Sequence, residues 1–149
     1  MKKKEAFSIK NKKANFEFIF IEEFIAGIVL VGSEVKSIRD GAVSFTDSYC
    51  YIKDNEVFLK NLHISEYKNA SYNKHEPKRE RKLLLNKREI KHLKEKISEK
   101  GLTIVPVKLF ISEKSLIKVV VALAKGKKLF DKRASLKEKD LKRQIKEEI

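Results

Sequence analysis

The sequence predicts a mainly β protein with short helices (α+β class): an OB-like antiparallel barrel of six strands, two to three helices and a flexible basic C-terminal tail. Three observations support this prediction. Six short stretches are apolar and rich in β-branched and aromatic residues, and two further segments combine helical periodicity with capping residues. Residues 125–149 contain ten Lys or Arg against five Asp or Glu, with too few apolar side chains to offset their ordering entropy.

The expected strands are short, as is typical of small antiparallel barrels, and polar residues separate them. They cover residues 16–21, 24–31, 48–53, 56–63, 102–111 and 115–124. Asp54 and Asn55, between the third and fourth strands, tolerate a tight hairpin turn. Gly27 favours a bend or bulge within its strand, and Pro106, which has no N–H to donate, is expected at an edge or bulge.

Two helices are expected, one early in the chain and one before the last two strands. They cover residues 33–41 and 86–101. Ser33 is a capping residue for the first helix, and Gly41 ends it. Asn86 and Glu89 form a capping box for the second helix, which Gly101 ends. An apolar stripe along the second helix is expected to lie against the barrel.

The composition favours nucleic acid as the partner of this chain. Its 149 residues carry a formal net charge of +14, which suits a phosphate backbone or an anionic membrane surface. The longest clean apolar run, residues 24–31, is far shorter than the ~20 residues of a membrane-spanning helix. The basic start of the chain has no apolar signal-peptide region behind it, and the lone Cys50 fits a reducing compartment. We therefore expect a cytoplasmic protein without membrane contact.

Catalytic chemistry is not indicated by the sequence. The three histidines and the single cysteine lie far apart in the chain, at His63, His75, His92 and Cys50. Their spacing matches no metal site, and the fingerprints of a nucleophile elbow, a P-loop or a dinucleotide fold are missing. Asp47 and Asp54 are better explained as turn residues than as an acid–base pair. We expect no enzyme activity, no metal and no cofactor.

Three basic stretches carry the functional signal. They are residues 2–14, 66–88 and 125–149. The second interleaves Tyr67, Tyr72 and His75 with many cations, a combination that can grip phosphates and stack unpaired bases. A solvated arm and a plain surface loop remain the alternatives for the first two stretches, and Leu83–Leu85 are expected to enter the core. The third has weak amphipathic periodicity and could become helical in a groove lined with phosphates.

Four segments together resemble one protein family. They are "GSEVKSIRDG", "HEPKRERKLLL", "GLTIVPVKLFI" and "LAKGKKLFDKR", and they occur in the order and at the spacing of the SsrA-binding protein family, also called small protein B. The resemblance runs from about residue 11 to the tail.

The resemblance implies a bacterial, cytoplasmic, non-enzymatic protein with an OB-like barrel over residues 1–130 and a tail over 131–149. Such a protein binds the tRNA-like domain of transfer-messenger RNA and delivers it to stalled ribosomes for trans-translation, so that incomplete peptides are tagged. Its other implied partners are elongation factor Tu, ribosomal protein S1, and the small-subunit decoding region and mRNA channel of the ribosome. The tail is expected to be disordered in the free protein and helical on the ribosome.

The resemblance and the basic stretches together nominate RNA-binding residues. The resemblance implies Asn11, Lys12, Lys13, Glu34, Lys36, Arg39, Lys125, Lys127 and Lys128, and the basic insert adds His75, Arg79, Arg81 and Lys82. Glu34 is implied to be an RNA-binding glutamate that accepts hydrogen bonds from a guanine edge or holds an arginine in place. The alternative for Glu34 is a favourable charge in the first turn of a helix.

The tail residues are implied to contact the ribosome. They are Phe130, Asp131, Lys132, Arg133, Lys137, Lys142 and Arg143. Phe130 stands where the family often has His or Tyr, and the tail is slightly short, so its anchoring is left open.

Two other functions remain open at this stage. A general RNA chaperone with an OB barrel would bind single-stranded or structured RNAs with little discrimination. A ribonuclease would need a clustered acid–base or metal site, which the sequence does not indicate.

Overall fold

The computed structural model describes residues 7–66, 75–99 and 101–127. The elements occur in the order β1 (Phe7–Lys10), α1 (Lys12–Glu17), β2 (Phe18–Ile28), α2 (Gly32–Arg39), β3 (Val43–Ser44), β4 (Tyr49–Lys53), β5 (Glu56–Lys60), β6 (His63–Ile64), β7 (Arg81–Leu84), α3 (Lys87–Ile97), β8 (Leu102–Ile111) and β9 (Ile117–Gly126). The expected tail, residues 131–149, lies outside the described residues, and so does the boundary expected at 130.

Six strands pair in a closed ring, β8–β4–β5–β7–β2–β9, and β9 returns to β8. Every pairing in the ring is antiparallel. β1 adds to β8 outside the ring, and β3 and β6 form a separate two-stranded ribbon. Closure leaves few open edges within the ring; the weakest join is between β4 and β8, which pair only at Cys50 and Ile104. The predicted class, a mainly β fold with short helices and six antiparallel strands, is confirmed.

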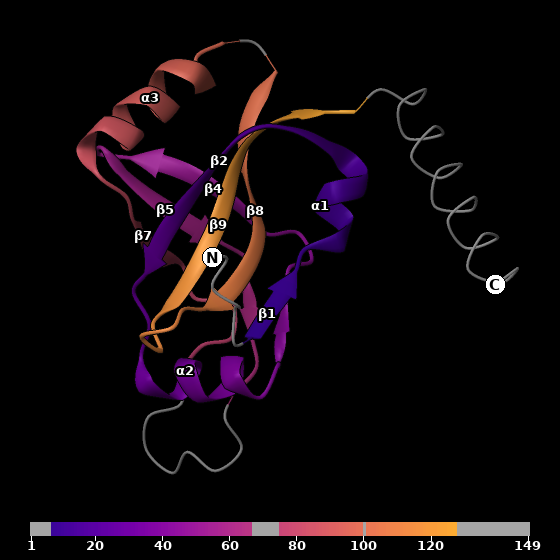
Figure 1. Ribbon diagram of the computed structural model, residues 1–149, viewed down its shortest axis with the longest axis vertical. Helices are drawn as coiled ribbons and strands as arrows, with labels where there is room; N and C mark the ends of the chain where they lie inside the picture. The colour runs from indigo at the N-terminus through magenta and orange to yellow at the C-terminus, as the bar shows by residue number, and fades with distance from the viewer. Residues whose placement is uncertain (1–6, 67–74, 100, 128–149) are drawn as a thin grey trace, which may run out of the picture.

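The first two predicted strands are one strand, β2, which is wrapped across the front of the barrel in Figure 1. A register shift between Phe20 and Glu22 marks a bulge, so the strand bends without ending. Phe18 and Phe20 pack on a small outer cluster, whereas Phe24 packs against the main core after the bulge. The two glutamates between the apolar runs resembled a turn because they are exposed, but the backbone stays paired through them.

Gly27 has a different role from the bend that we expected. It pairs with Leu84 of β7 and with Lys118 of β9, so β2 passes there from one neighbour to the other. A Cβ atom at Gly27 would lie 3.2 Å from the Cβ of Leu84. Glycine therefore permits a close approach of two strands at this corner, which is the second common reason for glycine in a strand.

The turn predictions are confirmed. Asp54 and Asn55 have φ values of 52° and 60°, as a tight hairpin between β4 and β5 requires, and Asp47 also has a positive φ. Pro106 lies at a bulge, because the register of β8 against β9 shifts between Pro106 and Lys108.

The helices differ from expectation at their starts and ends. α2 begins one residue earlier than predicted, after Val31, and Ser33 lies buried inside the helix, so it is not the cap. In α3 the capping box is confirmed, with the Asn86 side chain accepting from the Glu89 N–H at 2.8 Å. α3 ends at Ile97, earlier than the Gly101 stop that we expected.

Two elements that matter for function were not predicted, α1 and β7. α1 forms within the first basic stretch because the Asn11 side chain accepts from the Ala14 N–H and its amide donates to the Pro106 carbonyl at 2.8 Å. β7 forms within the long insert, where Arg81 and Leu83 alternate inward with Lys82 and Leu84 outward. Leu83 enters the core as expected, whereas Leu84 is 53% exposed.

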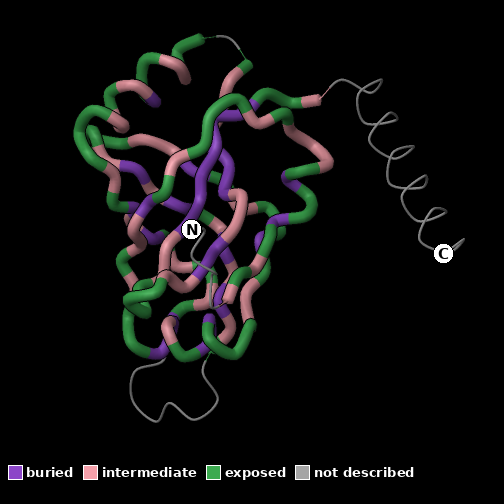
Figure 2. The backbone as a smooth tube through the Cα atoms, in the orientation of Figure 1, coloured by how far each residue is buried: buried purple, intermediate pink, exposed green. Residues whose placement is uncertain are grey.

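The core lies inside the ring, where Figure 2 shows the buried residues concentrated along the central strands. α3 covers one end of the barrel and α2 lies at the other end (Figure 1). Cys50 points into this core, and burial raises the pKa of its thiol, so it stays protonated. Within the described ranges no helix has the length and apolar composition needed to span a membrane.

Leu93 is the buried residue of α3, and its replacement tests how strongly this helix is held. Its side chain is fully buried in the main core. We expect Leu93→Ala to lower the free energy of unfolding by about 2–5 kcal/mol, because it leaves a cavity under the helix. Urea denaturation measures this loss. Lys91→Ala, an exposed position on the same helix, should change stability by less than about 0.5 kcal/mol; equal losses in both variants would contradict the packing.

Candidate nucleic-acid interface

A buried carboxylate organises one end of the barrel. Glu34 lies in the first turn of α2, and its side chain is 0% exposed. One oxygen, Oε1, accepts from the Val31 N–H at 2.9 Å and from Arg79 Nη2 at 2.5 Å. The other, Oε2, accepts from Arg81 Nε. A buried carboxylate needs such partners, because an unpaired charge in the interior is very costly.

Arg81 extends this network to neighbouring segments. Its side chain is 0% exposed, although it belongs to the basic insert. Nη1 donates to the Leu62 carbonyl at 2.6 Å and Nη2 to the Pro77 carbonyl at 3.1 Å. One guanidinium therefore joins α2, β7, the segment before β6 and the part of the insert around Pro77. Its role is to hold the fold together.

His75 fixes a second point of the insert. It is 6% exposed, and both ring nitrogens have partners: Nδ1 lies 2.8 Å from Ser33 Oγ and Nε2 lies 2.8 Å from the Ile64 carbonyl. The Ile64 N–H also donates to the Pro77 carbonyl. The described residues on both sides of segment 67–74 are thus tied to each other and to α2.

The pKa values reflect this burial. Burial raises the pKa of Glu34, but the hydrogen bonds from Arg79 and Val31 and the charge of Arg81 outweigh it, so the pKa is lowered overall. Burial lowers the pKa of Arg81, and the Glu34 carboxylate opposes this shift. Glu34 is therefore ionised at neutral pH, and the pair is charged in the folded protein.

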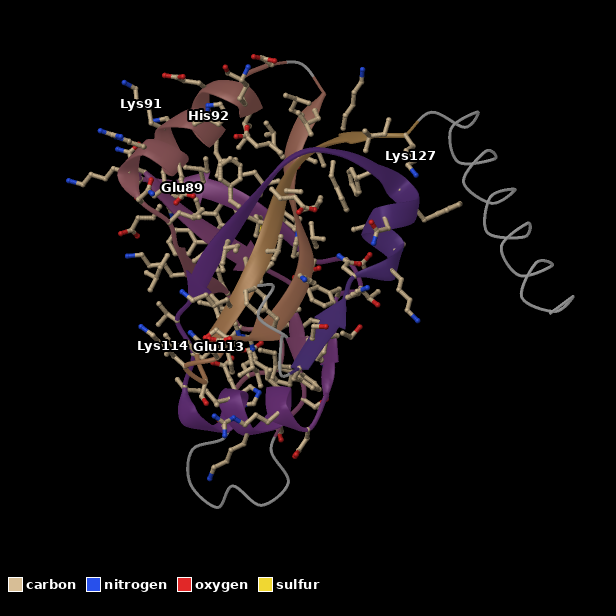
Figure 3. All side chains as sticks on the ribbon, in the orientation of Figure 1. Glu89, Lys91, His92, Glu113, Lys114 and Lys127 are labelled. Carbon is tan, nitrogen blue, oxygen red and sulfur yellow. The ribbon has the colours of Figure 1, made fainter. Side chains whose placement is uncertain are left out.

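The surface cations form two groups. Lys12 and Lys13 are exposed on α1, and Lys125 is exposed at the end of β9. Lys127 lies beside them, because its N–H donates to the Glu17 carbonyl and its Nζ to the Asn15 carbonyl at 3.1 Å. Figure 3 shows Lys127 next to the α1 ribbon. We call this set, Lys12, Lys13, Lys125 and Lys127, the α1 group.

The second group lies on and beside α2, at the opposite end of the barrel in Figure 1. Lys36 and Arg39 are exposed on α2, and the side chain of Arg79 is 36% exposed while it holds Glu34. We call these three residues the α2 group. Lys82 lies apart on the outer face of β7 and pairs with Glu56 at 2.8 Å.

Several residues of the expected RNA-binding set are buried in this structure. The side chains of Glu34, His75 and Arg81 are buried and hydrogen-bonded, so they do not face a partner on the surface. Asn11 is also buried and caps α1. Glu34 holds two arginines, and it also lies in the first turn of α2, where it accepts from the Val31 N–H. Lys128 and the tail residues Phe130, Asp131, Lys132, Arg133, Lys137, Lys142 and Arg143 lie outside the described residues, as do Tyr67 and Tyr72.

The burial of Arg81 is indicated by the sequence itself. In the segment "RKLL", Arg81 and Leu83 lie two residues apart, and a strand points such residues to the same face. If Leu83 enters the core, Arg81 follows it and needs a buried anion. Across the described ranges, no cluster of three or more His, Cys, Asp or Glu could hold a metal ion.

Replacing the buried carboxylate tests this network. We expect Glu34→Gln to destabilise the protein by about 3–5 kcal/mol at neutral pH, because it leaves Arg81 buried without its counter-ion. The folded-state pKa of Glu34 lies below its ordinary 4.5, so its contribution is present above 4.5 and disappears as the pH falls through the folded value. Urea denaturation of both proteins across acid pH should therefore show the difference shrink on acidification.

A matched control uses an exposed ion pair. The side chains of Lys82 and Glu56 are 40% and 44% exposed. We expect Glu56→Gln to cost less than about 1 kcal/mol. A pH-independent difference between wild type and Glu34→Gln would contradict the ionised pair.

Comparison with known proteins identifies the family. The model of the SmpB protein family matches residues 8–149. The SsrA-binding protein of Phocaeicola vulgatus is 58% identical over 93% of this chain and 92% of its own length, and that of Thermosipho melanesiensis is 50% identical over 92% and 93%. A chain of the solved structure described as "tmRNA-SmpB: a journey to the center of the bacterial ribosome" superposes with a TM-score of 0.70 at 43% identity, over 82% of this chain and 85% of that one. The chain therefore belongs to the SmpB family of SsrA-binding proteins.

Proposed function

We propose that this chain binds the tRNA-like domain of transfer-messenger RNA and delivers it to stalled ribosomes for trans-translation. The observation that carries the proposal is the family match over residues 8–149, which spans both the barrel and the tail. Relatives at 50–58% identity are named SsrA-binding proteins, and a related chain of 43% identity belongs to a structure of tmRNA and SmpB on the bacterial ribosome. The site of action is the bacterial cytoplasm.

The described surface supports RNA binding through two basic groups. We assign contacts with RNA phosphates to the α1 group and the α2 group, because their cations are partly or fully exposed on short helices and strand ends. Asn11 shapes the first group by capping α1, and Glu34, Arg81 and His75 shape the second by fixing α2 and Arg79. A charge of +14 steers such a protein toward RNA with strong dependence on salt.

The tail carries the second half of the proposal. Residues 131–149 enter the empty mRNA channel and become helical there, with Phe130, Asp131, Lys132 and Arg133 at the decoding region and Lys137, Lys142 and Arg143 along the channel. Lys128 extends the α1 group toward the tail. Elongation factor Tu and ribosomal protein S1 take part in delivery. The role is binding, and RNA incubated with the protein and Mg²⁺ stays intact.

Neutralising two cations of the α1 group tests the RNA contact. We expect Lys12→Gln with Lys13→Gln to weaken binding of the tRNA-like RNA and to reduce the slope of log affinity against log salt by roughly 2, because two phosphate contacts are lost. Fluorescence anisotropy at several salt concentrations measures both effects. Arg88→Gln with Lys91→Gln, two exposed cations of α3, is the matched control and should leave the slope nearly unchanged.

The same titration separates the proposal from a general RNA chaperone. Unlabelled bulk tRNA should compete poorly with the tRNA-like RNA at fixed salt. Equal competition, with a loss of slope in both double variants alike, would indicate binding by charge alone and would overturn the assignment of the α1 group.

A tail variant tests the division of labour between barrel and tail. We expect Asp131→Ala with Lys132→Ala to keep the affinity for transfer-messenger RNA and to abolish tagging of stalled peptides, because the barrel holds the RNA while the tail acts on the ribosome. Anisotropy and a reconstituted tagging assay give the two readouts. If RNA affinity falls in proportion to tagging, the barrel and tail do not act separately.

A further inference from the structure

The outer wall of the barrel at β4 and β5 carries an aromatic surface that the RNA-binding groups above do not include. Alternation along β4 points Cys50 into the core and Tyr49 and Tyr51 outward. Along β5 the same alternation points Phe58 and Lys60 outward. We propose that this wall is a stacking platform for unpaired nucleotides of RNA. Tyr49, Tyr51 and Phe58 form the platform.

The rings of Tyr49, Tyr51 and Phe58 are neighbours on the sheet surface. Tyr51 lies directly across from Phe58, and their ring centroids are 5.7 Å apart at an interplanar angle of 29°, a stacked arrangement. The centroid of Tyr49 is 6.4 Å from that of Tyr51. Tyr49 is 40% exposed, so a large part of its side chain remains accessible to a ligand although Tyr51 lies beside it. Partly exposed rings held in a row on strands provide π-faces for successive bases.

Two clefts flank Tyr49. One, of 460 Å³, lies between β4 and α3 and is lined by Tyr49, Tyr51, Thr103 and Lys94. The other, of 240 Å³, lies toward α1 and is lined by Tyr49, Thr103, Asn11 and Lys13. They exist because β4 and β8 are joined by a single residue pair, so the barrel wall is open on both sides of it. Tyr49 and Thr103 form the ridge between the clefts.

The charges around the platform favour a polyanion. Lys60 lies opposite Tyr49, and Lys82 lies opposite Phe58 on the far side of β5. Lys94 adds a cation to the larger cleft, whereas the smaller cleft carries Lys13 together with Glu17 and Asp47. Lys82 and Glu56 neutralise each other, so Lys60 and Lys94 supply the positive charge beside the rings. Rings flanked by lysines suit single-stranded RNA, because its unpaired bases can stack on the rings while its phosphates contact the lysines. In a duplex the bases are paired inside and cannot reach the rings.

The test uses a probe with neither tertiary structure nor strong self-stacking, fluorescein-labelled octa-uridylate, and the full chain. We expect Tyr49→Ala to weaken binding at least about fivefold, with an unchanged salt slope, because a stacking contact and no phosphate contact is lost. Tyr49→Phe, which keeps the ring, should bind within twofold of wild type. Leu116→Ala, an exposed apolar residue of the β8–β9 loop, is the control for a general surface change.

Two further experiments test the phosphate contact of Lys60 and the place where the RNA binds. Lys60→Gln should reduce the salt slope for octa-uridylate by roughly 0.7, the value for one phosphate contact with a single strand. Photo-cross-linking with 5-iodouridine octamers should modify Tyr49 or Tyr51. The chain has only two other tyrosines, Tyr67 and Tyr72, both in the basic insert, so peptide mapping separates the two locations.

Three results would overturn the platform: wild-type affinity of Tyr49→Ala, equal losses in Tyr49→Phe and Tyr49→Ala, or cross-links confined to Tyr67 and Tyr72. The proposed binding of the tRNA-like RNA can be judged separately, by titrating the same variants with that RNA. A loss for octa-uridylate alone assigns the platform to a single strand, and a loss for both RNAs assigns it to unpaired nucleotides of the tRNA-like RNA as well.

Discussion

The ion pair between Glu34 and Arg81 is the constraint from which the α2 end of the molecule follows. Arg81 belongs to β7, which closes the barrel between β5 and β2, so its inward side chain must be neutralised within the core. Glu34 supplies that charge from the first turn of α2, and this fixes the helix against the barrel end. The remaining donors of Arg81 hold the Leu62 carbonyl, which precedes the basic insert, and the Pro77 carbonyl, which lies within it, so they tie the insert to the rest of the barrel.

This arrangement divides the arginines and lysines into structural and available ones. Arg81 is fully buried, and its contacts are all within the fold. Arg79 does both, because one of its nitrogens holds Glu34 while part of its side chain remains exposed. A simple count of cations in the insert would assign all of them to RNA. Burial shows that fewer of these cations are exposed than the sequence contains, and that Arg79 is held by the buried Glu34 carboxylate.

Local patterns in the sequence were enough for the fold class, most strands, the β4–β5 turn and the capping box of α3, because each depends on residues close together in the chain. The bulge that joins the two halves of β2 and the pairing of Glu34 with Arg81 depend on contacts between distant segments, which no local pattern encodes. α1 was missed because its cap, Asn11, is fixed by the Pro106 carbonyl 95 residues away. The α1 and α2 cations were identified as candidates, but their separation into two groups could not be predicted without the strand order.

A closed ring leaves recognition mainly to side chains on its ends and walls, since most strand edges within it are paired. The α2 group lies at one end of the barrel and the α1 group beside the barrel, and both are stiffened by buried polar contacts, of Glu34 and of Asn11. The wall is different, because β4 meets β8 through only one residue pair, Cys50 with Ile104. At this join the Cys50 side chain packs in the core, whereas Tyr49 and Tyr51 on the same strand face outward. Since alternate residues of a strand serve opposite faces, the wall can present aromatic rings to a ligand without any loss of packing inside the barrel.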